Sequence, residues 1–98
     1  MDKDAVIAVL RQHRAELERL GVRHAALFGS VARGEAGPKS DIDIAIDLDR
    51  SRRPTIYDYV GMQQFISGLF DGSVDVVDRE SLKPAVRESV MADLVRAF

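Results

Sequence analysis

The sequence lacks cysteine, a clear excess of one charge sign and any long apolar run, and each absence narrows what the protein can be. Without cysteine there is no disulfide, no thiolate zinc site and no cysteine nucleophile. The formal net charge is −2, from 14 basic and 16 acidic residues, so nothing draws the whole protein to nucleic acid or an anionic membrane. Residues 1–21, MDKDAVIAVLRQHRAELERLG, predict neither a signal peptide nor a membrane span. We therefore expect a soluble, cytoplasmic protein with no membrane partner and no direct nucleic-acid partner.

Length and hydropathy patterning predict one domain, residues 1–98, of α/β (α+β) sandwich class, in which helices pack on a small mixed sheet. The apolar periods predict strands at 22–28, 41–48 and 73–78, and helices at 4–20, 57–70 and from about 82 onward. A short helical turn should follow residue 28. The last few residues are either the end of the final helix or extended chain.

The segment DIDIAIDL, residues 41–48, alternates carboxylates with apolar side chains. Alternate residues of a strand share a face, so Asp41, Asp43 and Asp47 point one way while the isoleucines enter the core. Carboxylates about 7 Å apart can reach one divalent cation or bracket two cations, and oxygen ligands favour Mg²⁺ or Mn²⁺ over zinc. The plainer alternative is a solvated acidic strand face.

Gly29 and Ser30 lie where the first strand gives way to a helical turn. Backbone N–H groups at such a turn bind anions, and glycine lets the backbone approach a phosphate closely. Ser30 either caps the turn or donates its hydroxyl to a phosphate oxygen. Arg33 follows on the same side, where it either contacts phosphate or pins the loop.

Asp75 is a third candidate carboxylate, in the segment SVDVVD. If strand 73–78 pairs beside strand 41–48, Asp75 joins Asp41 and Asp43 on one sheet face. Three carboxylates and a phosphate-binding turn predict a two-metal phosphoryl-transfer site, with Asp75 as metal ligand and base for the attacking hydroxyl.

The other polar and aromatic residues have plainer interpretations. We interpret Asp47 as solvated or supporting, and Asp49 and Asp78 as loop caps. His13 should be a half-buried histidine with a local partner, and His24 carries no signal. Arg50, Arg52 and Arg53 form a small basic cluster, which we expect to lie in a solvated loop. The alternative is that these arginines contact ATP or an acidic surface of a partner. The aromatic group of the helix expected at 57–70 is placed in the core rather than in a base-stacking platform: Tyr57, Tyr59, Phe65 and Phe70.

The combined motif carries a family resemblance. Gly29-Ser30, ten residues and Asp41-x-Asp43 reproduce the GS-x10-DxD pattern of the polymerase-beta-like nucleotidyltransferase superfamily. The run FGSVARGEAGPKSDIDIAID, with VDVVD and LKPAVRESV further on, resembles the minimal nucleotidyltransferases of the MNT type, many of which are antitoxins beside a HEPN-domain ribonuclease toxin.

This resemblance implies transfer of AMP from ATP, with Mg²⁺, to a tyrosine hydroxyl of a HEPN toxin, which neutralises the toxin. It implies that Gly29 and Ser30 bind the triphosphate. It implies a metal-binding set of three aspartates: Asp41, Asp43 and Asp75. Arg33 and Ser40 match nucleotide-binding positions of the motif whose roles are less defined.

Two further functions remain open from the sequence. The protein is a non-catalytic antitoxin that acts by direct binding, or a nucleotidyltransferase whose acceptor is a small-molecule hydroxyl or an RNA end. The chain is short for a large acceptor, and its charge does not favour RNA. A partner protein that completes the cleft is the simpler solution. The protein would then form a homo-oligomer or a hetero-oligomer with the toxin.

Overall fold

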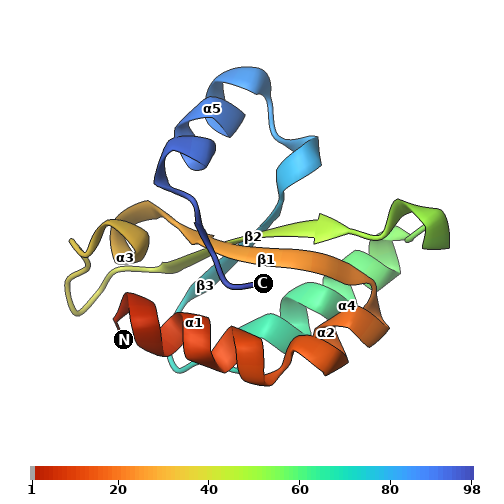
Figure 1. Cartoon of the computed structure of the whole chain (residues 1–98), viewed down its shortest axis with the longest axis horizontal. Coiled ribbons are helices and arrows are strands. Elements are labelled where there is room, and N and C mark those ends of the chain that lie inside the picture. Colours follow the sequence, from red (N-terminus) through yellow and green to blue (C-terminus); the bar gives the residue numbers. More distant parts are fainter. Residues whose placement is uncertain (1) are drawn as a thin grey trace.

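The structure, a computed structural model, describes residues 2–98 and consists of a mixed four-stranded sheet with five helices (Figure 1). The helices are α1 (Lys3–Gln12), α2 (Arg14–Leu20), α3 (Gly29–Arg33), α4 (Ile56–Ser67) and α5 (Pro84–Asp93). The strands are β1 (Val22–Phe28), β2 (Ile42–Leu48), β3 (Val74–Asp78) and β4 (Val95–Arg96). Two 3-10 turns, η1 (Arg50–Arg52) and η2 (Arg79–Ser81), follow β2 and β3. The predicted α/β class is confirmed.

The sheet order is β3-β2-β1-β4. β2 runs parallel to β3 and antiparallel to β1, and β1 runs antiparallel to β4. The crossover from β2 to β3 contains α4, as a parallel pair requires. The predicted pairing of the two carboxylate-bearing strands is therefore confirmed.

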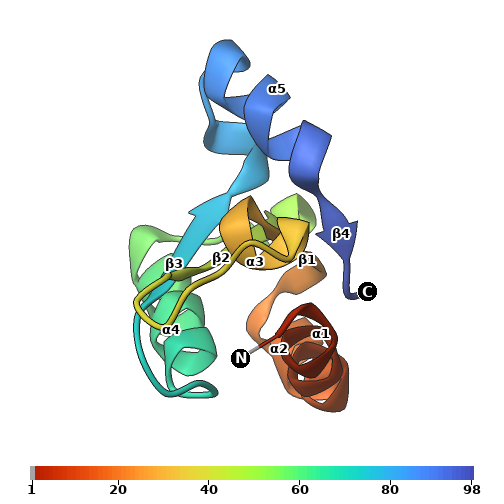
Figure 2. The same ribbon diagram turned by 90° about the vertical axis from the view of Figure 1, so that its left-hand side faces the viewer.

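The two faces of the sheet are covered unequally. Figures 1 and 2 show α1, α2 and α4 packed on one face, while α5 stands off the other. Ile42, Ile44 and Ile46 are buried, in agreement with the predicted alternation, and they join a core that includes Val6, Leu10 and Leu17. We call the opposite side, which carries Asp43 and Ala45, the open face.

The predicted helix 4–20 is divided at His13. Its Nδ1 donates to the carbonyl of Val9 at 2.9 Å, and its backbone N–H is shared between the carbonyls of Val9 and Leu10. A side chain that enters the backbone ladder in this way bends a helix. The half-buried histidine with a local partner is confirmed. Leu20 lies beyond the break and is 39% exposed, so it does not continue the buried stripe of Val6, Leu10 and Leu17.

Both ends of the α1–α2 pair follow the sequence. The Asp2 carboxylate accepts from the Ala5 N–H at 2.8 Å, which caps α1. Gly21 ends α2 in the left-handed region, at φ 104°, a conformation that glycine adopts without a steric cost.

The α4 helix begins with a capping box, in which the Thr55 hydroxyl accepts from the Asp58 N–H and the Asp58 carboxylate accepts from the Thr55 N–H. Met62 and Ile66 are buried. Phe70 lies just after the helix and is buried in the core, as predicted. Tyr57 is 85% exposed, so its predicted place in the core is wrong: it lies in the first turn, on the side that faces away from the sheet.

The chain ends as a strand, which settles the open alternative for the last residues. The Ala97 and Phe98 N–H groups donate to the Ala25 carbonyl, and the Phe98 side chain is buried. Of the apolar stripe of α5, Val90 is buried but Val86 is half exposed, because this helix stands off the sheet. Within residues 2–98, no helix combines the length and the apolar character needed to cross a membrane.

Candidate functional site

The strand β2 places its carboxylates on the open face. Asp43 is half-buried within the strand, and Asp41 lies one residue before the strand begins and is exposed. The isoleucines between them fill the core, so the strand is held in place by its buried side while the carboxylates face the other way.

Asp75 on β3 lies directly opposite Asp43 in the parallel register. Neighbouring strands are about 4.8 Å apart and paired residues share a face, so these two carboxylates lie side by side. Asp75 is exposed, whereas Asp43 is partly covered. The expectation that Asp75 reaches the same face as Asp43 is therefore confirmed.

This crowding perturbs Asp43. Burial raises the pKa of Asp43, and the negative charges of Asp75 and Asp41 raise it further, while the Arg33 guanidinium opposes the change. Burial and like-charge neighbours both disfavour the ionised carboxylate. A perturbed carboxylate beside two others is typical of a site that is completed by a cation.

Gly29, the first residue of the Gly-Ser turn, packs against one of these carboxylates, Asp43. Its φ is 75°, in the left-handed region, and a Cβ at this position would collide with the Oδ2 of Asp43. Only glycine satisfies both the backbone conformation and the contact. The turn therefore lies against Asp43, as the spacing of the motif predicted.

The helix α3 begins at Gly29 without a side-chain cap. The capping alternative for Ser30 is therefore wrong, and the first N–H groups of the turn have no acceptor within the helix. Such groups suit an anion. The phosphate-binding role of Gly29 and Ser30 stays a prediction.

Arg33 is held by two carboxylates. Its Nε donates to Glu35 at 2.9 Å and its Nη1 donates to Asp93, at the end of α5, at 2.6 Å. In this arrangement Arg33 ties α3 to α5, which favours the pinning alternative. It is close enough to Asp43 to influence the pKa of that residue.

Ser40 shapes the loop that leads into β2. Its hydroxyl accepts from the Gly37 N–H at 2.9 Å, and its own N–H donates to the Gly37 carbonyl at 3.1 Å. A pocket of about 380 Å³ lies between this loop and residues 71–73, and Ser40 and Asp41 line it. The nucleotide-binding role of Ser40 stays a prediction.

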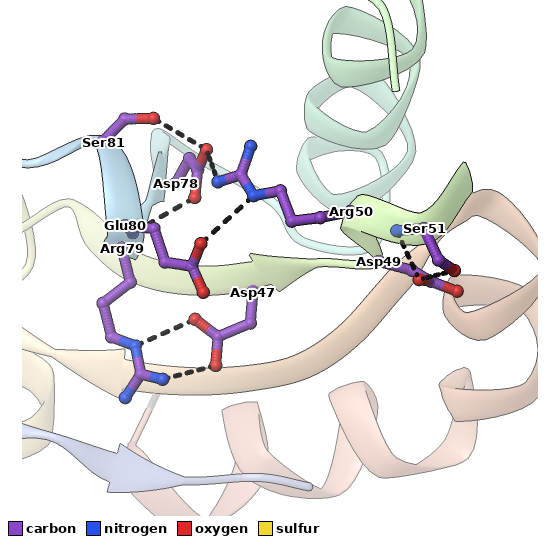
Figure 3. A network of polar contacts seen from close by, with 8 residues as sticks. All are labelled: Asp47, Asp49, Arg50, Ser51, Asp78, Arg79, Glu80 and Ser81. Atoms are coloured by element: carbon purple, nitrogen blue, oxygen red, sulfur yellow. Dashed lines mark hydrogen bonds and ion pairs between the residues drawn. The ribbon is translucent and has the colours of Figure 1, made fainter. Parts of the chain in front are cut away.

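Three other aspartates form ion pairs or caps (Figure 3): Asp47, Asp49 and Asp78. Asp47 is buried and accepts two hydrogen bonds from Arg79, at 2.8 and 2.6 Å, so of its two interpretations, solvated or supporting, the solvated one is wrong. Asp49 and Asp78 cap η1 and η2, as predicted. No sequence signal marked Arg79. Asp43 pairs with Asp75 across β2 and β3, so Asp47 and Arg79, each four residues further along the chain, also lie opposite each other.

The arginine cluster is more structured than a solvated loop. Arg50 donates to Asp78 at 2.6 Å and to Glu80 at 3.2 Å, which links η1 to η2 (Figure 3). Arg52 donates to the carbonyls of Glu18 and Arg19 at the end of α2. Cations stabilise such C-terminal carbonyls. These two arginines serve the fold.

The donor set of the site fits a hard divalent cation. Asp43 and Asp75 offer adjacent carboxylates, and their repulsion would be relieved by a positive charge between them. Across residues 2–98, no group of three or more acidic or histidine side chains is arranged closely enough to hold a metal ion by itself. A site that keeps positions for water and phosphate oxygens suits Mg²⁺.

Comparison with known proteins finds matches over most of the chain. The model of the family described as "Nucleotidyltransferase domain" matches residues 10–97. A protein adenylyltransferase, MntA of Thermococcus cleftensis, is 33% identical over 93 residues, which cover 94% of this chain and 92% of that protein.

Solved structures share the fold. A protein assigned as a minimal nucleotidyltransferase superposes with a TM-score of 0.71 at 31% identity, and the match covers 97% of this chain and 95% of that one. A toxin–antitoxin complex crystallised with AMP-PNP contains a chain with a TM-score of 0.70 at 23% identity, covering 90% of this chain and 72% of that one. At that identity the second likeness shows the fold alone.

Proposed function

The chain belongs to the nucleotidyltransferase domain family, as a minimal nucleotidyltransferase of the MNT type, and from this premise we propose that it is a Mg²⁺-dependent protein adenylyltransferase. Its substrate is ATP, and it transfers AMP to a hydroxyl group of a partner protein. Mn²⁺ is the alternative cation.

One observation carries this proposal: the Gly-Ser turn lies against Asp43, and Asp43 lies beside Asp75. A phosphate-binding turn and a carboxylate pair in contact are the two halves that a nucleotidyl-transfer site needs. Positioning and charge neutralisation account for most of the catalysis in such transfers.

The chain's own residues divide the work. The backbone at Gly29 and Ser30 holds the triphosphate, and Asp41, Asp43 and Asp75 hold the cation. When bound, Mg²⁺ neutralises phosphate charge and lowers the pKa of the attacking hydroxyl. The exposed Asp75 carboxylate accepts the proton of that hydroxyl.

The proposed acceptor is a tyrosine of a HEPN-domain ribonuclease toxin, which the transfer neutralises. Three observations support a protein acceptor. A relative of similar length is named a protein adenylyltransferase, a structural neighbour is part of a toxin–antitoxin complex, and the family resemblance implies a HEPN toxin. The open face is also only partly covered within this chain, so a partner can complete it.

A second function, inhibition by contact alone, has one observation in its favour. The start of α4 exposes Ile56, Tyr57 and Val60, by 72%, 85% and 42%. Contiguous exposed apolar side chains mark interaction surfaces. A contact antitoxin would use such a surface without needing the carboxylates.

Intact mass spectrometry separates the two functions. The protein is incubated with ATP, Mg²⁺ and the protein encoded beside its gene, and the mass of that neighbour is measured. An added AMP that disappears in the Asp41→Ala, Asp43→Ala double variant, but not in the exposed control Glu88→Gln, supports the enzyme. Neutralisation that persists in the double variant with no mass change supports the contact antitoxin instead.

A further inference from the structure

A small pocket lies on the open face, beyond the carboxylates. Ala26 on β1 and Ala45 on β2 form its floor, and these two residues are paired across the strands. Its walls come from Arg79, Leu94, His24 and Arg96. Its volume is about 170 Å³. Nothing in the proposed function so far uses this pocket.

The pocket is adjacent to the proposed reaction centre. Ala45 follows Asp43 by two residues on the same strand face, which is a distance of about 7 Å. Gly29 lies at the opposite side of Asp43, since Phe28 pairs with Asp43 and Ala26 pairs with Ala45. The order along the face is therefore the Gly-Ser turn, the carboxylates and then the pocket.

The chemistry of transfer gives this order a meaning. Attacking and leaving oxygens lie roughly in line on opposite sides of the phosphorus. The leaving pyrophosphate is proposed to lie at Gly29 and Ser30, so the attacking hydroxyl approaches from the other side of the carboxylates. That side is where the pocket opens.

The size of the pocket selects one kind of occupant. A water occupies about 30 Å³, so 170 Å³ holds roughly five or six waters, or a single side chain of similar size. Ligand sites for whole small molecules run from about 300 Å³ upward. A nucleoside is too large, whereas one aromatic ring fits on the flat floor made by two alanines.

One wall of the pocket is held by an ion pair, and the rim of the pocket carries a positive charge. Arg79 is held by its two bonds to the buried Asp47, and Arg96 donates to the His24 Nδ1 at 3.0 Å on the exposed rim. The Arg79 charge is offset by Asp47, which also lines the pocket, whereas the exposed Arg96 contacts the His24 ring rather than a carboxylate. An acceptor segment with an acidic residue near its tyrosine suits this rim.

We propose that the pocket over Ala26 and Ala45 is the acceptor subsite and takes the phenol ring of a tyrosine from the partner protein. This proposal rests on the proposed function. In the step it serves, the tyrosine oxygen forms a bond to the α-phosphorus of ATP, and the bond from that phosphorus to the bridging oxygen breaks. Pyrophosphate leaves and the phenolic proton passes to a carboxylate and then to water. The products are a tyrosine that carries AMP on its phenol oxygen, pyrophosphate and a proton.

The first test uses binding alone. N-acetyl-tyrosinamide is titrated into isotope-labelled protein with Mg²⁺ and a non-hydrolysable ATP analogue, and amide NMR shifts are followed. Saturable shifts at Ala26, Ala45 and Arg96, absent with N-acetyl-leucinamide, are the expected result. Shifts confined to other surfaces, or equal shifts with both probes, overturn the proposal.

The second test uses the reaction. Ala45→Met fills the pocket and should slow AMP transfer to the partner roughly 100-fold, since a displacement of about 1 Å can cost that much. ATP affinity should stay within about twofold, because this residue lies outside the nucleotide site. Ala15→Met, on an exposed part of α2, is the matched control and should transfer at the wild-type rate. Transfer by Ala45→Met at the wild-type rate overturns the proposal.

A variant at the surface tests the pocket independently, in case the buried substitution Ala45→Met impairs folding. Arg96→Glu lies on the exposed rim and should raise the KM for the partner about tenfold with little change in kcat. An unchanged KM overturns the role of the rim. If the wild-type protein modifies no partner at all while N-acetyl-tyrosinamide still binds the pocket, the proposed function fails and the pocket stands only as a tyrosine-binding site, not as an acceptor subsite.

Discussion

Replacing Asp43 by asparagine should make the metal-free protein more stable at neutral pH. Asp43 is partly covered and lies directly opposite Asp75, and its pKa is raised by burial and by its acidic neighbours. A carboxylate whose pKa is raised on folding is charged at a cost in the native state. The asparagine side chain has nearly the same size and carries no charge, so the Asp43→Asn substitution would remove that cost.

The size of the gain follows from the strand spacing. Two charges about 4.8 Å apart repel by about 3.5 kcal/mol at an effective dielectric constant of 20, and by about 0.9 kcal/mol in bulk water. Asp75 is exposed, so the lower figure applies and the gain should be about 1 kcal/mol. For a domain of this size, that corresponds to a rise in Tm of about 4–8 °C.

The pH dependence identifies the cause. The unfolded pKa of an aspartate is about 3.9, and the folded pKa of Asp43 lies above it. Wild-type stability therefore falls as pH rises from about 4 through the folded pKa, and below about 4 the cost disappears because both states are protonated. The gain in Asp43→Asn should be present at pH 7 and absent at about pH 3.5.

Thermal unfolding in chelator and low salt measures this, with Glu88→Gln as the control for loss of an exposed carboxylate. Adding Mg²⁺ should raise the Tm of the wild type and leave that of Asp43→Asn nearly unchanged. An equal gain in Tm at both pH values would falsify the proposed repulsion between Asp43 and its acidic neighbours. An equal rise in Tm with Mg²⁺ in both proteins would refute the cation site at Asp43.

Three further substitutions test other parts of the structure. Gly29→Ala should lower the free energy of unfolding by about 1–2 kcal/mol, because alanine is strained in the left-handed backbone conformation of this position. The new Cβ would also collide with the Asp43 carboxylate, so calorimetry should show ATP binding at least about tenfold weaker. Unchanged ATP binding would contradict the close approach of Gly29 to Asp43. Arg79→Ala leaves the Asp47 carboxylate buried without its partner and should lower the free energy of unfolding in urea by about 3 kcal/mol. An Asp47→Asn, Arg79→Met double variant should recover most of this stability. No recovery would show that the loss does not come from an uncompensated buried charge. Thr55→Ala should cost about 1 kcal/mol through its capping box while AMP transfer continues at the wild-type rate, and a slower transfer would link α4 to the site.

Local rules carried most of the fold. The alternation in DIDIAIDL gave the buried isoleucines and the facing aspartates, because the period of a strand leaves no other arrangement that buries three isoleucines. Gly21 and Asp2 marked helix ends through their own backbone and side-chain chemistry. The break at His13 was not predictable from periodicity, since it depends on one side chain bonding to the Val9 carbonyl.

Long-range pairing set the limit for the candidate site. Asp75 could be placed beside Asp43 only on the assumption that their strands pair. The burial of Asp47 depends on Arg79, which lies 32 positions away and in no motif. The exposure of Tyr57 depends on which side of α4 faces the sheet, and that of Val86 on how far α5 stands off the sheet, and an apolar stripe alone defines neither.

The central claim is that the open face transfers the AMP part of ATP to a protein, and isotope labelling tests it most directly. Two reactions with Mg²⁺ and the partner protein differ only in whether the ATP carries its label on the α- or the γ-phosphate. Label from the α-phosphate should appear in the partner and label from the γ-phosphate should leave as pyrophosphate, with both signals lost in Asp43→Asn. Incorporation of the γ-label, or α-label incorporation that persists in Asp43→Asn, would contradict the claim.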